Sequence, residues 1–281
     1  AGSLLIPSIA GIFILGWVSG YITSRSVDMF AGQGDRIPSL VKYLVYCFAG
    51  IGPLWFAHEL FLATLVLLFI KLLDKNNRLL TLGSKTNLIT LLLLFFPVWG
   101  SAQILNTPLV VVYRNGIYIF MFLLGYYVFS HDHVQEILEK YYLPFSVLAV
   151  VCGVFYTIYY FGADFASVEC LRSAFTNLYA WLMILALLGF GRRWINKKTR
   201  FTTYMITGSF GIFVLHYPVL IVIAYLITTY LALPVWGDYV VLLLATAVAV
   251  PLFYEIVSRI PVLRFLLLYK KAPKGTDMLS G

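Results

Sequence analysis

The sequence predicts an all-α fold, a polytopic membrane bundle of about eight transmembrane helices. Of its 281 residues, 61% are apolar and only 11% are charged, whereas average globular chains carry about 25% charged residues. Its 20 basic and 12 acidic side chains cannot cover a water-facing surface, so most of the surface must face lipid. Apolar runs such as 117–129 and 240–253 are continuous, unlike the alternating strands of a membrane barrel. These observations exclude a soluble protein and favour helices, which satisfy their own backbone hydrogen bonds in hydrocarbon.

Eight segments approach the ~20 residues that a helix needs to cross a bilayer. The third is the weakest, because Pro97 and Gln103 interrupt it and proline disrupts helical hydrogen bonding. The stretch 38–50 is apolar but short and contains Lys42, so we expect an interfacial helix there rather than a further span. The expected spans are 4–23, 54–73, 86–105, 108–129, 142–161, 168–190, 204–231 and 235–258.

The distribution of lysine and arginine predicts the orientation of these spans. Cytoplasmic loops hold the excess of both residues, and alternate loops here hold 15 on one side and 5 on the other. We therefore expect both termini in the cytoplasm. The same loops account for the net charge of +8, because basic loops are attracted to an anionic lipid leaflet. No basic tract with interleaved aromatic residues lies outside the expected spans, so we expect no nucleic-acid partner.

The organisation of the chain is simple. Without a linker, repeat or low-complexity tract, it should form one integral membrane domain over 4–269, followed by a flexible cytoplasmic tail at 270–281. The first span lacks the charged segment that begins a signal peptide. The cysteines show no metal-ligand spacing, and we expect no metal. A bridge between Cys47 and Cys170, both near the expected outer face, is an alternative to simple apolar packing.

Ionisable side chains at membrane depth are costly and are therefore candidates for function. Most of those in this chain are expected towards the outer ends of the spans, where a carboxylate, an imidazole and two guanidinium groups could form one polar pocket that opens outward. Among the aromatic residues, which otherwise suit an interfacial belt, only Trp55 shares a helical turn with one of these groups. The ionisable candidates are His58, Glu59, Arg114, Arg172, His216 and Glu255.

Each candidate also has a structural interpretation. Arg114 and Arg172 could extend to the lipid headgroups, and Glu59 could pair with one of them, since buried carboxylates are normally paired. His58 and Glu59 are neighbours in sequence, so their side chains are about 100° apart around the helix axis and cannot both face one direction. Of the two, His58 is the less suited to point into the bundle. His216 could be a hydrogen-bonded core histidine or a proton carrier. The motifs of soluble hydrolases, metalloproteases and nucleotide-binding enzymes are absent.

Two segments carry a family resemblance. Residues 52–60, Gly-Pro-Leu-Trp-Phe-Ala-His-Glu-Leu, resemble the Gly-(Pro/His)-Leu-Trp-Phe-x-x-x-Leu element of the membrane acyltransferase 3 family. Residues 209–218, Ser-Phe-Gly-Ile-Phe-Val-Leu-His-Tyr-Pro, are similar to its Ser-Phe-x-(Ile/Leu)-(Tyr/Phe)-x-(Leu/Ile)-His-x-Pro element. Residues 4–7 and 122–129 fit two further stretches of that family's pattern. The resemblance covers nearly the whole chain in order and spacing.

The resemblance implies an enzyme of the bacterial plasma membrane that transfers an acyl group, expected to be acetyl, from acyl-CoA to a hydroxyl of a cell-envelope saccharide or related acceptor. It implies ten helices with cytoplasmic ends, of which the first two would precede residue 4. The family's first-helix histidine and its Arg-x-x-Arg element have no counterpart here. We therefore expect residues 1–281 alone to be inactive.

The resemblance also suggests roles for the candidates, because acylation needs a base, a polarised thioester and a route for CoA. His216 would act as a base or proton relay, while Glu59 would orient a histidine or accept a hydrogen bond from a sugar hydroxyl. The basic loops 71–85 and 192–200 lie on the expected side of entry for the CoA phosphates. The expected catalytic residues are His216, Glu59 and His58, and the expected substrate-binding residues are Arg114, Arg172 and Trp55.

Two other classes of function are open. Polar residues at depth also mark the paths of transporters, so the chain could move a glycan or a lipid-linked substrate without acyl chemistry. It lacks the inverted halves and matching broken helices that favour such a transporter. It could also be a membrane interaction subunit without chemistry. Consumption of acyl-CoA separates the enzyme from both.

Overall fold

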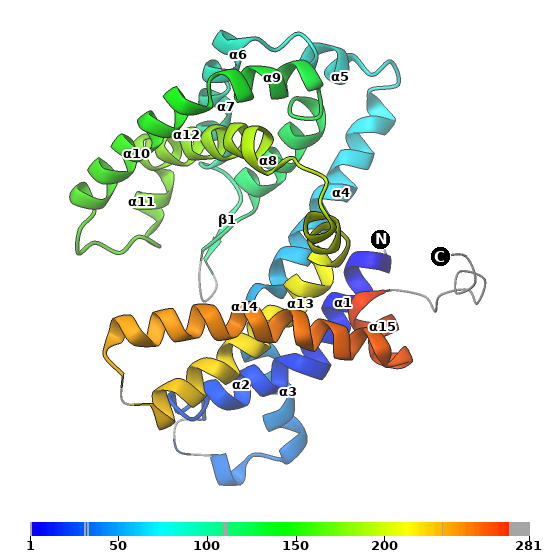
Figure 1. Cartoon of the computed structure of the whole chain (residues 1–281), viewed down its shortest axis with the longest axis vertical. Helices are drawn as coiled ribbons and strands as arrows, with labels where there is room; N and C mark the ends of the chain where they lie inside the picture. The colour runs from blue at the N-terminus through cyan, green and yellow to red at the C-terminus, as the bar shows by residue number, and fades with distance from the viewer. Residues whose placement is uncertain (1, 31, 33, 109–111, 232, 270–281) are drawn as a thin grey trace. The chain divides into compact units, whose positions relative to one another are not determined.

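A computed structural model describes residues 2–30, 32, 34–108, 112–231 and 233–269 (Figure 1). In these residues the fold is helical apart from one short hairpin, so the predicted all-α class is confirmed. Contacts divide the chain into two compact units. We call residues 1–61 with 199–281 the terminal unit, and residues 62–198 the central unit. The expectation of one domain over 4–269 stays a prediction, and the expected tail at 270–281 lies outside the described residues.

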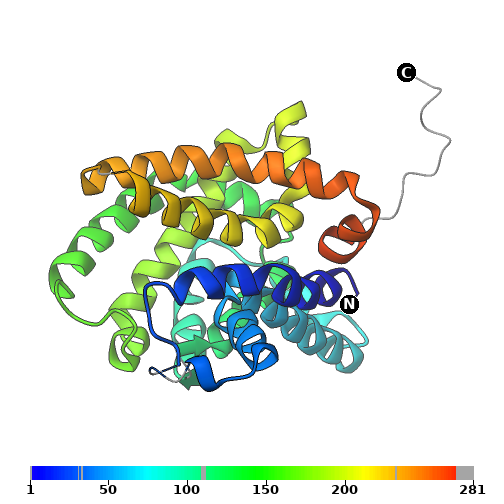
Figure 2. The same ribbon diagram turned by 90° about the horizontal axis from the view of Figure 1, so that it is seen from below.

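The terminal unit combines helices from the two parts of the chain that lie furthest apart in sequence. Helix α1 packs against α15, α2 packs against α3 and α13, and α13 runs along α14, which Figure 2 shows as neighbouring yellow and orange helices. The segments α1, η1 and α2 follow one another without a break, η1 being a π-helical turn. The elements are α1 (Gly2–Gly11), η1 (Ile12–Gly16), α2 (Trp17–Thr23), η2 (Gly34–Arg36), α3 (Ser39–Ala49), η3 (Gly52–Leu54), the first residues of α4 (Trp55–Leu73), α13 (Arg200–Tyr230), α14 (Val235–Arg259) and α15 (Pro261–Leu268).

Helices α2 and α3 approach each other so closely that glycine is required at the contact. A Cβ atom at Gly20 would clash with the backbone carbonyl of Tyr46, and one at Gly50 would clash with the carbonyl of Gly16. Spacing small residues four apart, as at Gly16 and Gly20, is a common way to bring membrane helices into backbone contact. The short helix α3 is thereby held against α2, with Leu40 and Phe48 on its exposed side.

We expect Gly20→Ala to destabilise the protein by about 1–3 kcal/mol, because the added methyl group must displace the backbone of α3 rather than a flexible side chain. Thermal unfolding of the purified protein in detergent, followed by intrinsic fluorescence, measures the change. The matched control is Gly125→Ala in α8, where a Cβ atom meets nothing within 4 Å and alanine should be neutral or stabilising by up to about 1 kcal/mol. Equal melting temperatures for both variants would contradict the close approach of α2 and α3.

The central unit consists mainly of shorter helices. Helix α12 is packed against α10 on one side and against α7 and α9 elsewhere, and Trp181 on α12 is only 1% exposed. Its buried neighbours include Val134 and Leu138 of α9. The elements are the remainder of α4, α5 (Arg78–Gly83), α6 (Leu88–Leu93), α7 (Phe95–Ser101), β1 (Asn106–Pro108), β2 (Val112–Arg114), α8 (Asn115–Tyr127), α9 (Asp132–Lys140), α10 (Tyr142–Tyr159), α11 (Val168–Arg172), α12 (Ala174–Phe190) and η4 (Gly191–Ile195).

Six of the eight expected spans correspond to helices long and apolar enough to cross a membrane, among the described residues. The other two, expected at 86–105 and 108–129, are shorter. The first ends at Ser101, and Leu105 then adopts a left-handed backbone conformation with φ 52°. The second starts only at Asn115, because β1 and β2 pair antiparallel in the preceding residues. The six are Leu4–Thr23, Gly52–Leu73, Tyr142–Tyr159, Ala174–Ile195, Arg200–Tyr230 and Val235–Arg259.

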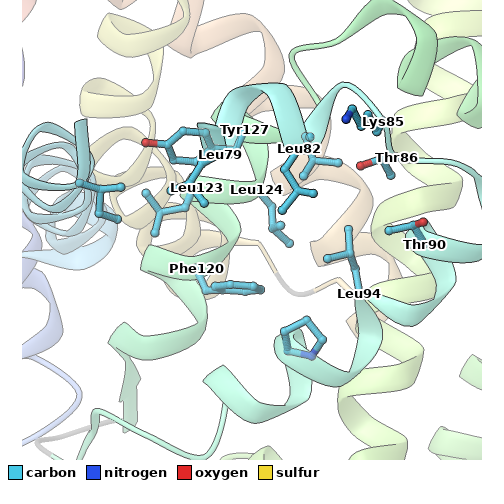
Figure 3. A pocket seen from close by; sticks show the side chains of 14 residues that line it. Leu79, Leu82, Lys85, Thr86, Thr90, Leu94, Phe120, Leu123, Leu124 and Tyr127 are labelled. Atoms are coloured by element: carbon cyan, nitrogen blue, oxygen red, sulfur yellow. The ribbon is translucent and has the colours of Figure 1, made fainter. Parts of the chain in front are cut away.

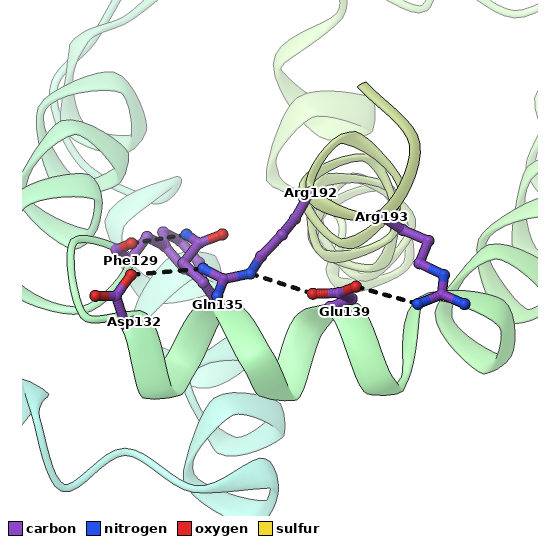
Figure 4. A network of polar contacts seen from close by, with 6 residues as sticks. All are labelled: Phe129, Asp132, Gln135, Glu139, Arg192 and Arg193. Atoms are coloured by element: carbon purple, nitrogen blue, oxygen red, sulfur yellow. Dashed lines mark hydrogen bonds and ion pairs between the residues drawn. The ribbon is translucent and has the colours of Figure 1, made fainter. Parts of the chain in front are cut away.

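An ion-pair network fastens α9 to the end of α12 (Figure 4). The carboxylate of Glu139 lies between two guanidinium groups, with Arg192 Nε at 3.3 Å from Oε2 and Arg193 Nη1 at 3.4 Å from Oε1. Arg192 Nη1 also lies 3.6 Å from Asp132 Oδ1, but the Asp132 side chain is 94% exposed. Exposed pairs contribute about 1 kcal/mol or less, so the network orients η4 more than it stabilises the unit.

Candidate functional site

The two segments that contain the predicted catalytic residues pack directly against each other in the terminal unit. The rings of Phe56, at the start of α4, and Phe213, on α13, lie 5.9 Å apart in an edge-on arrangement. Leu54 is buried in the same cluster as Val214. Gly52 has φ +48°, and a Cβ atom there would clash with the ring of Tyr217. Residues 52–60 and 209–218, far apart in sequence, therefore form one local site.

His216 has a defined side-chain partner. Its Nδ1 atom lies 2.5 Å from the backbone carbonyl oxygen of Phe213. Because a carbonyl oxygen can only accept, Nδ1 must carry the donated proton. In the neutral imidazole, Nε2 then keeps its lone pair and can accept a proton. The ring is half-buried, and Pro218, two residues further on, lines an apolar cavity of about 380 Å³.

Glu59 is a buried carboxylate, only 8% exposed. Its Oε1 atom is buried and has no hydrogen-bond partner, and no ion pair in the described part of the chain includes Glu59. Burying a charged or polar oxygen without a donor is unfavourable. The arrangement therefore leaves Glu59 with the capacity to accept a hydrogen bond from a bound molecule.

His58 contacts the first helix of the chain. Its Nε2 atom lies 3.4 Å from Ser8 Oγ, and Ser8 is fully buried, with its hydroxyl 3.1 Å from the carbonyl oxygen of Leu5. Although we expected His58 to be less suited than Glu59 to face the protein, its ring too is half-buried. Trp55 is also half-buried, with its ring 6.0 Å from that of Phe56. Ser8 was not among the predicted site residues, although it is a hydroxyl side chain within an otherwise apolar span.

Arg114 belongs to a second polar group, in the central unit. Its Nη2 atom donates to the carbonyl oxygen of Leu171 at 2.9 Å and to Asn177 Oδ1 at 2.8 Å. Asn177 is completely buried and donates through Nδ2 to the carbonyls of Leu171 and Ser173. The guanidinium of Arg114 thus joins β2 to the connection between α11 and α12. This arrangement favours an internal structural contact over extension to the lipid headgroups.

The charge of Arg114 is not balanced by a carboxylate among the described residues, none of which forms an ion pair with it. Its Nε atom is buried without a partner. Arg114 precedes α8, outside the six candidate spans, and burial lowers its pKa from the ordinary value. An arginine nevertheless keeps its proton in proteins.

Arg172 lies at the end of α11, next to Leu171, to which Arg114 is hydrogen-bonded, but the two arginine side chains differ in their surroundings. Its side chain is exposed, and it is its backbone carbonyl that is held, by Trp99 Nε1 and Gln103 Nε2, each at 3.0 Å. The guanidinium of Arg172 is therefore the one available to a ligand. Asn177 was not among the predicted site residues. Its side-chain amide stands out in the sequence only as a polar group within the apolar run that begins at residue 174.

Neither a metal centre nor a disulfide is present in the described residues. No group of three or more histidine, cysteine or acidic side chains there could hold a metal ion. All three cysteines are free, so Cys47 and Cys170 are not bridged. The thiol of Cys170 lies 3.5 Å from the Tyr156 hydroxyl instead.

Comparisons with known proteins show which family this chain resembles in sequence. A family model described as an acyltransferase domain matches residues 1–255. Glucans biosynthesis protein C of Escherichia coli strain 536 is 24% identical, over 93% of this chain and 72% of the relative. The protein of that name from Escherichia coli strain 55989 is also 24% identical, over 84% of this chain and 66% of the relative. The chain thus spans about two thirds to three quarters of the length of these relatives. No solved structure matches.

Proposed function

Because this chain belongs to the acyltransferase 3 family, whose domain model matches residues 1–255, we propose that it is a membrane O-acyltransferase of the bacterial plasma membrane. It transfers an acyl group, acetyl in the simplest case, from acyl-CoA to a hydroxyl of a cell-envelope saccharide. The observation that carries this proposal is the packing of residues 52–60, which include Glu59, against residues 209–218, which include His216. The similar glucans biosynthesis proteins favour a glucan or a related saccharide as acceptor.

The proposed chemistry uses the free lone pair of His216. Nε2 takes the proton of the acceptor hydroxyl while the hydroxyl oxygen attacks the thioester carbonyl carbon. The carbon–sulfur bond breaks, and the proton passes to the departing CoA sulfur. Glu59 accepts a hydrogen bond from a neighbouring sugar hydroxyl through its unpartnered Oε1, and His58 with Ser8 completes the polar surface. These groups provide a base and a means of orientation.

The proposed donor approaches through the basic loops. Arg192 and Arg193 already bind Glu139, and Lys71 Nζ donates to the hydroxyl of Tyr126 at 2.9 Å. The side chains of Lys75 and Arg78 make no ion pair in the described part of the chain, so these two cations are available for the CoA phosphates. Of the two arginines, Arg172 suits a saccharide better, because its guanidinium is exposed whereas Arg114 is held internally. In the terminal unit, the indole of Trp55 offers an aromatic ring for a sugar.

Consumption of acyl-CoA tests the proposed function. Membranes from a host that lacks the gene, and from the same host with the whole gene restored, are incubated with acetyl-CoA labelled in the acetyl group. We expect gene-dependent release of free CoA together with ester-linked label in the saccharide fraction that mild base removes. Transport of saccharide across the membrane without release of CoA would indicate that the protein is a transporter and not an acyltransferase. If the envelope has the same acyl content with and without the gene, the acyltransferase assignment is refuted.

We expect Glu59→Gln to lower the rate of acyl transfer by about 10- to 100-fold, because the amide keeps the shape of the side chain but removes the charge that strengthens its hydrogen bond to the acceptor. Release of CoA by membranes with matched amounts of protein measures the rate. Glu136→Gln is the control, since Glu136 is exposed on α9 and should leave the rate unchanged. Equal rates of acyl transfer in Glu59→Gln and Glu136→Gln would show that Glu59 does not bind the acceptor.

A further inference from the structure

A large cavity lies within the central unit, and none of the residues assigned to catalysis lines it. It has a volume of about 640 Å³, within the roughly 300–1,000 Å³ typical of small-molecule sites. The end of α4, helices α5 to α8 and the turn between α5 and α6 surround it. Most of its wall is aliphatic or aromatic (Figure 3), including Ile70, Leu79, Leu82, Leu94, Phe120 and Leu124.

The polar side chains of the wall lie mainly at one end. Lys85, Thr86 and Thr90 come from the turn between α5 and α6 and from α6, and Figure 3 shows them together on one side of the cavity. Lys85 is exposed and makes no ion pair in the described part of the chain. Tyr127, on the opposite side in Figure 3, has a buried hydroxyl with no hydrogen-bond partner. The cavity is therefore amphipathic, with an apolar body and a cationic edge.

We propose that this cavity binds one acyl chain of an anionic phospholipid, with the lipid phosphate against Lys85. The apolar walls match a hydrocarbon chain, whose burial is favourable by about 0.8 kcal/mol per methylene group. The unpaired ammonium of Lys85 matches a phosphate, and Figure 3 shows the Thr86 side chain next to Lys85. Lys85 belongs to the basic loop 71–85, which is expected at the cytoplasmic leaflet, where anionic lipids are found. This lipid site is independent of the proposed acyl transfer.

The chemistry of the walls argues against CoA itself as the occupant. The pantetheine arm of CoA has two amide groups, and each would need a hydrogen-bond partner if it were buried. Apart from Lys85, two threonines and Tyr127, the wall consists of residues without a side-chain donor or acceptor, among them leucines, Pro97 and Phe120. A lipid chain needs no such partner. The polar groups of the phospholipid, its phosphate and ester carbonyls, lie together at the head and would meet the end that holds Lys85.

Lipid retention tests this proposal. The whole protein is reconstituted into phosphatidylcholine bilayers that contain a minority of phosphatidylglycerol, then extracted in mild detergent, and the bound lipid is identified by native mass spectrometry. We expect the wild-type protein to retain phosphatidylglycerol. Lys85→Glu should reduce retention by about tenfold, because reversing one charge changes its attraction to the phosphate. Leu82→Trp, which fills the cavity from a position that is 67% exposed, should reduce it similarly.

Lys75→Glu makes the same change of charge in the same loop but does not line the cavity, and it should retain lipid like the wild type. Unchanged melting temperatures confirm that the variants are folded. Equal retention of phosphatidylglycerol by Lys85→Glu and Lys75→Glu would overturn the role of the headgroup. Equal retention by Leu82→Trp and wild type would overturn the cavity as the chain site. Displacement of the lipid by acetyl-CoA would assign the cavity to the acyl donor instead.

Discussion

Exchange of His216 for glutamine should lower acyl transfer by about 10²- to 10⁴-fold, the contribution usual for a general base. Glutamine can still donate a hydrogen bond to the carbonyl of Phe213, which the imidazole contacts at 2.5 Å. It cannot accept and return a proton, so the fold of the site is kept while the chemistry is lost. The initial rate of CoA release by membranes, normalised to the amount of the protein, measures the effect.

His133 provides the matched control for this experiment. It is exposed on α9, in the central unit, and His133→Gln removes the same chemical group without touching the site. A normal rate in His133→Gln and a strongly reduced rate in His216→Gln are expected. If His216→Gln keeps more than about a tenth of the wild-type rate, His216 is a core histidine and another residue is the base, since loss of a true base has a larger effect.

Loss of the Arg114 side chain should have the largest effect on stability. Arg114→Leu removes two hydrogen bonds from a charged donor and leaves the Oδ1 atom of Asn177, which is fully buried, without that donor. Hydrogen bonds to charged groups contribute about 1.5–3 kcal/mol each, and a buried acceptor without a partner is itself costly. We expect a loss of about 2–4 kcal/mol, measured by thermal or denaturant unfolding in detergent.

Arg172→Leu is the control, because it removes the same charge from a side chain that is exposed and makes no ion pair among the described residues. Its stability should stay within about 0.5 kcal/mol of the wild type. If Arg172 binds the acceptor, this variant should instead raise the KM for saccharide. Similar stability losses in both variants would contradict the internal position of Arg114.

Hydropathy predicted most of the fold because a membrane helix must be apolar over a fixed length. The six long helices agree with six expected spans within several residues at either end. Composition could not predict the turn at Leu105 or the pairing of Thr107 with Tyr113, since both depend on backbone geometry in a segment that is as apolar as a helix. The expected fourth span therefore became a hairpin followed by the 13 residues of α8.

Part of the candidate site could be predicted from the sequence. Two short motifs identified the residues around Glu59 and His216, and the structure confirms only that these segments pack together, their chemical roles remaining predictions. Ser8 and Asn177 were missed because a single polar side chain in an apolar run gives no indication of its partner. The two arginines looked equivalent in sequence, and only tertiary contacts separate Arg114, which is held by Asn177, from Arg172.

The division of the chain also determines when the site can form during synthesis. Residues 62–198 are contiguous and can complete their packing as soon as they enter the membrane, as domains generally fold in units. In the terminal unit, α1 must wait for α15, and α2 must wait for α13. Ser8 and Glu59 therefore enter the bilayer long before the helix of His216 is made. The helices that carry these polar groups must therefore be tolerated in lipid before their partners are made, and the site is completed only when α13 is inserted.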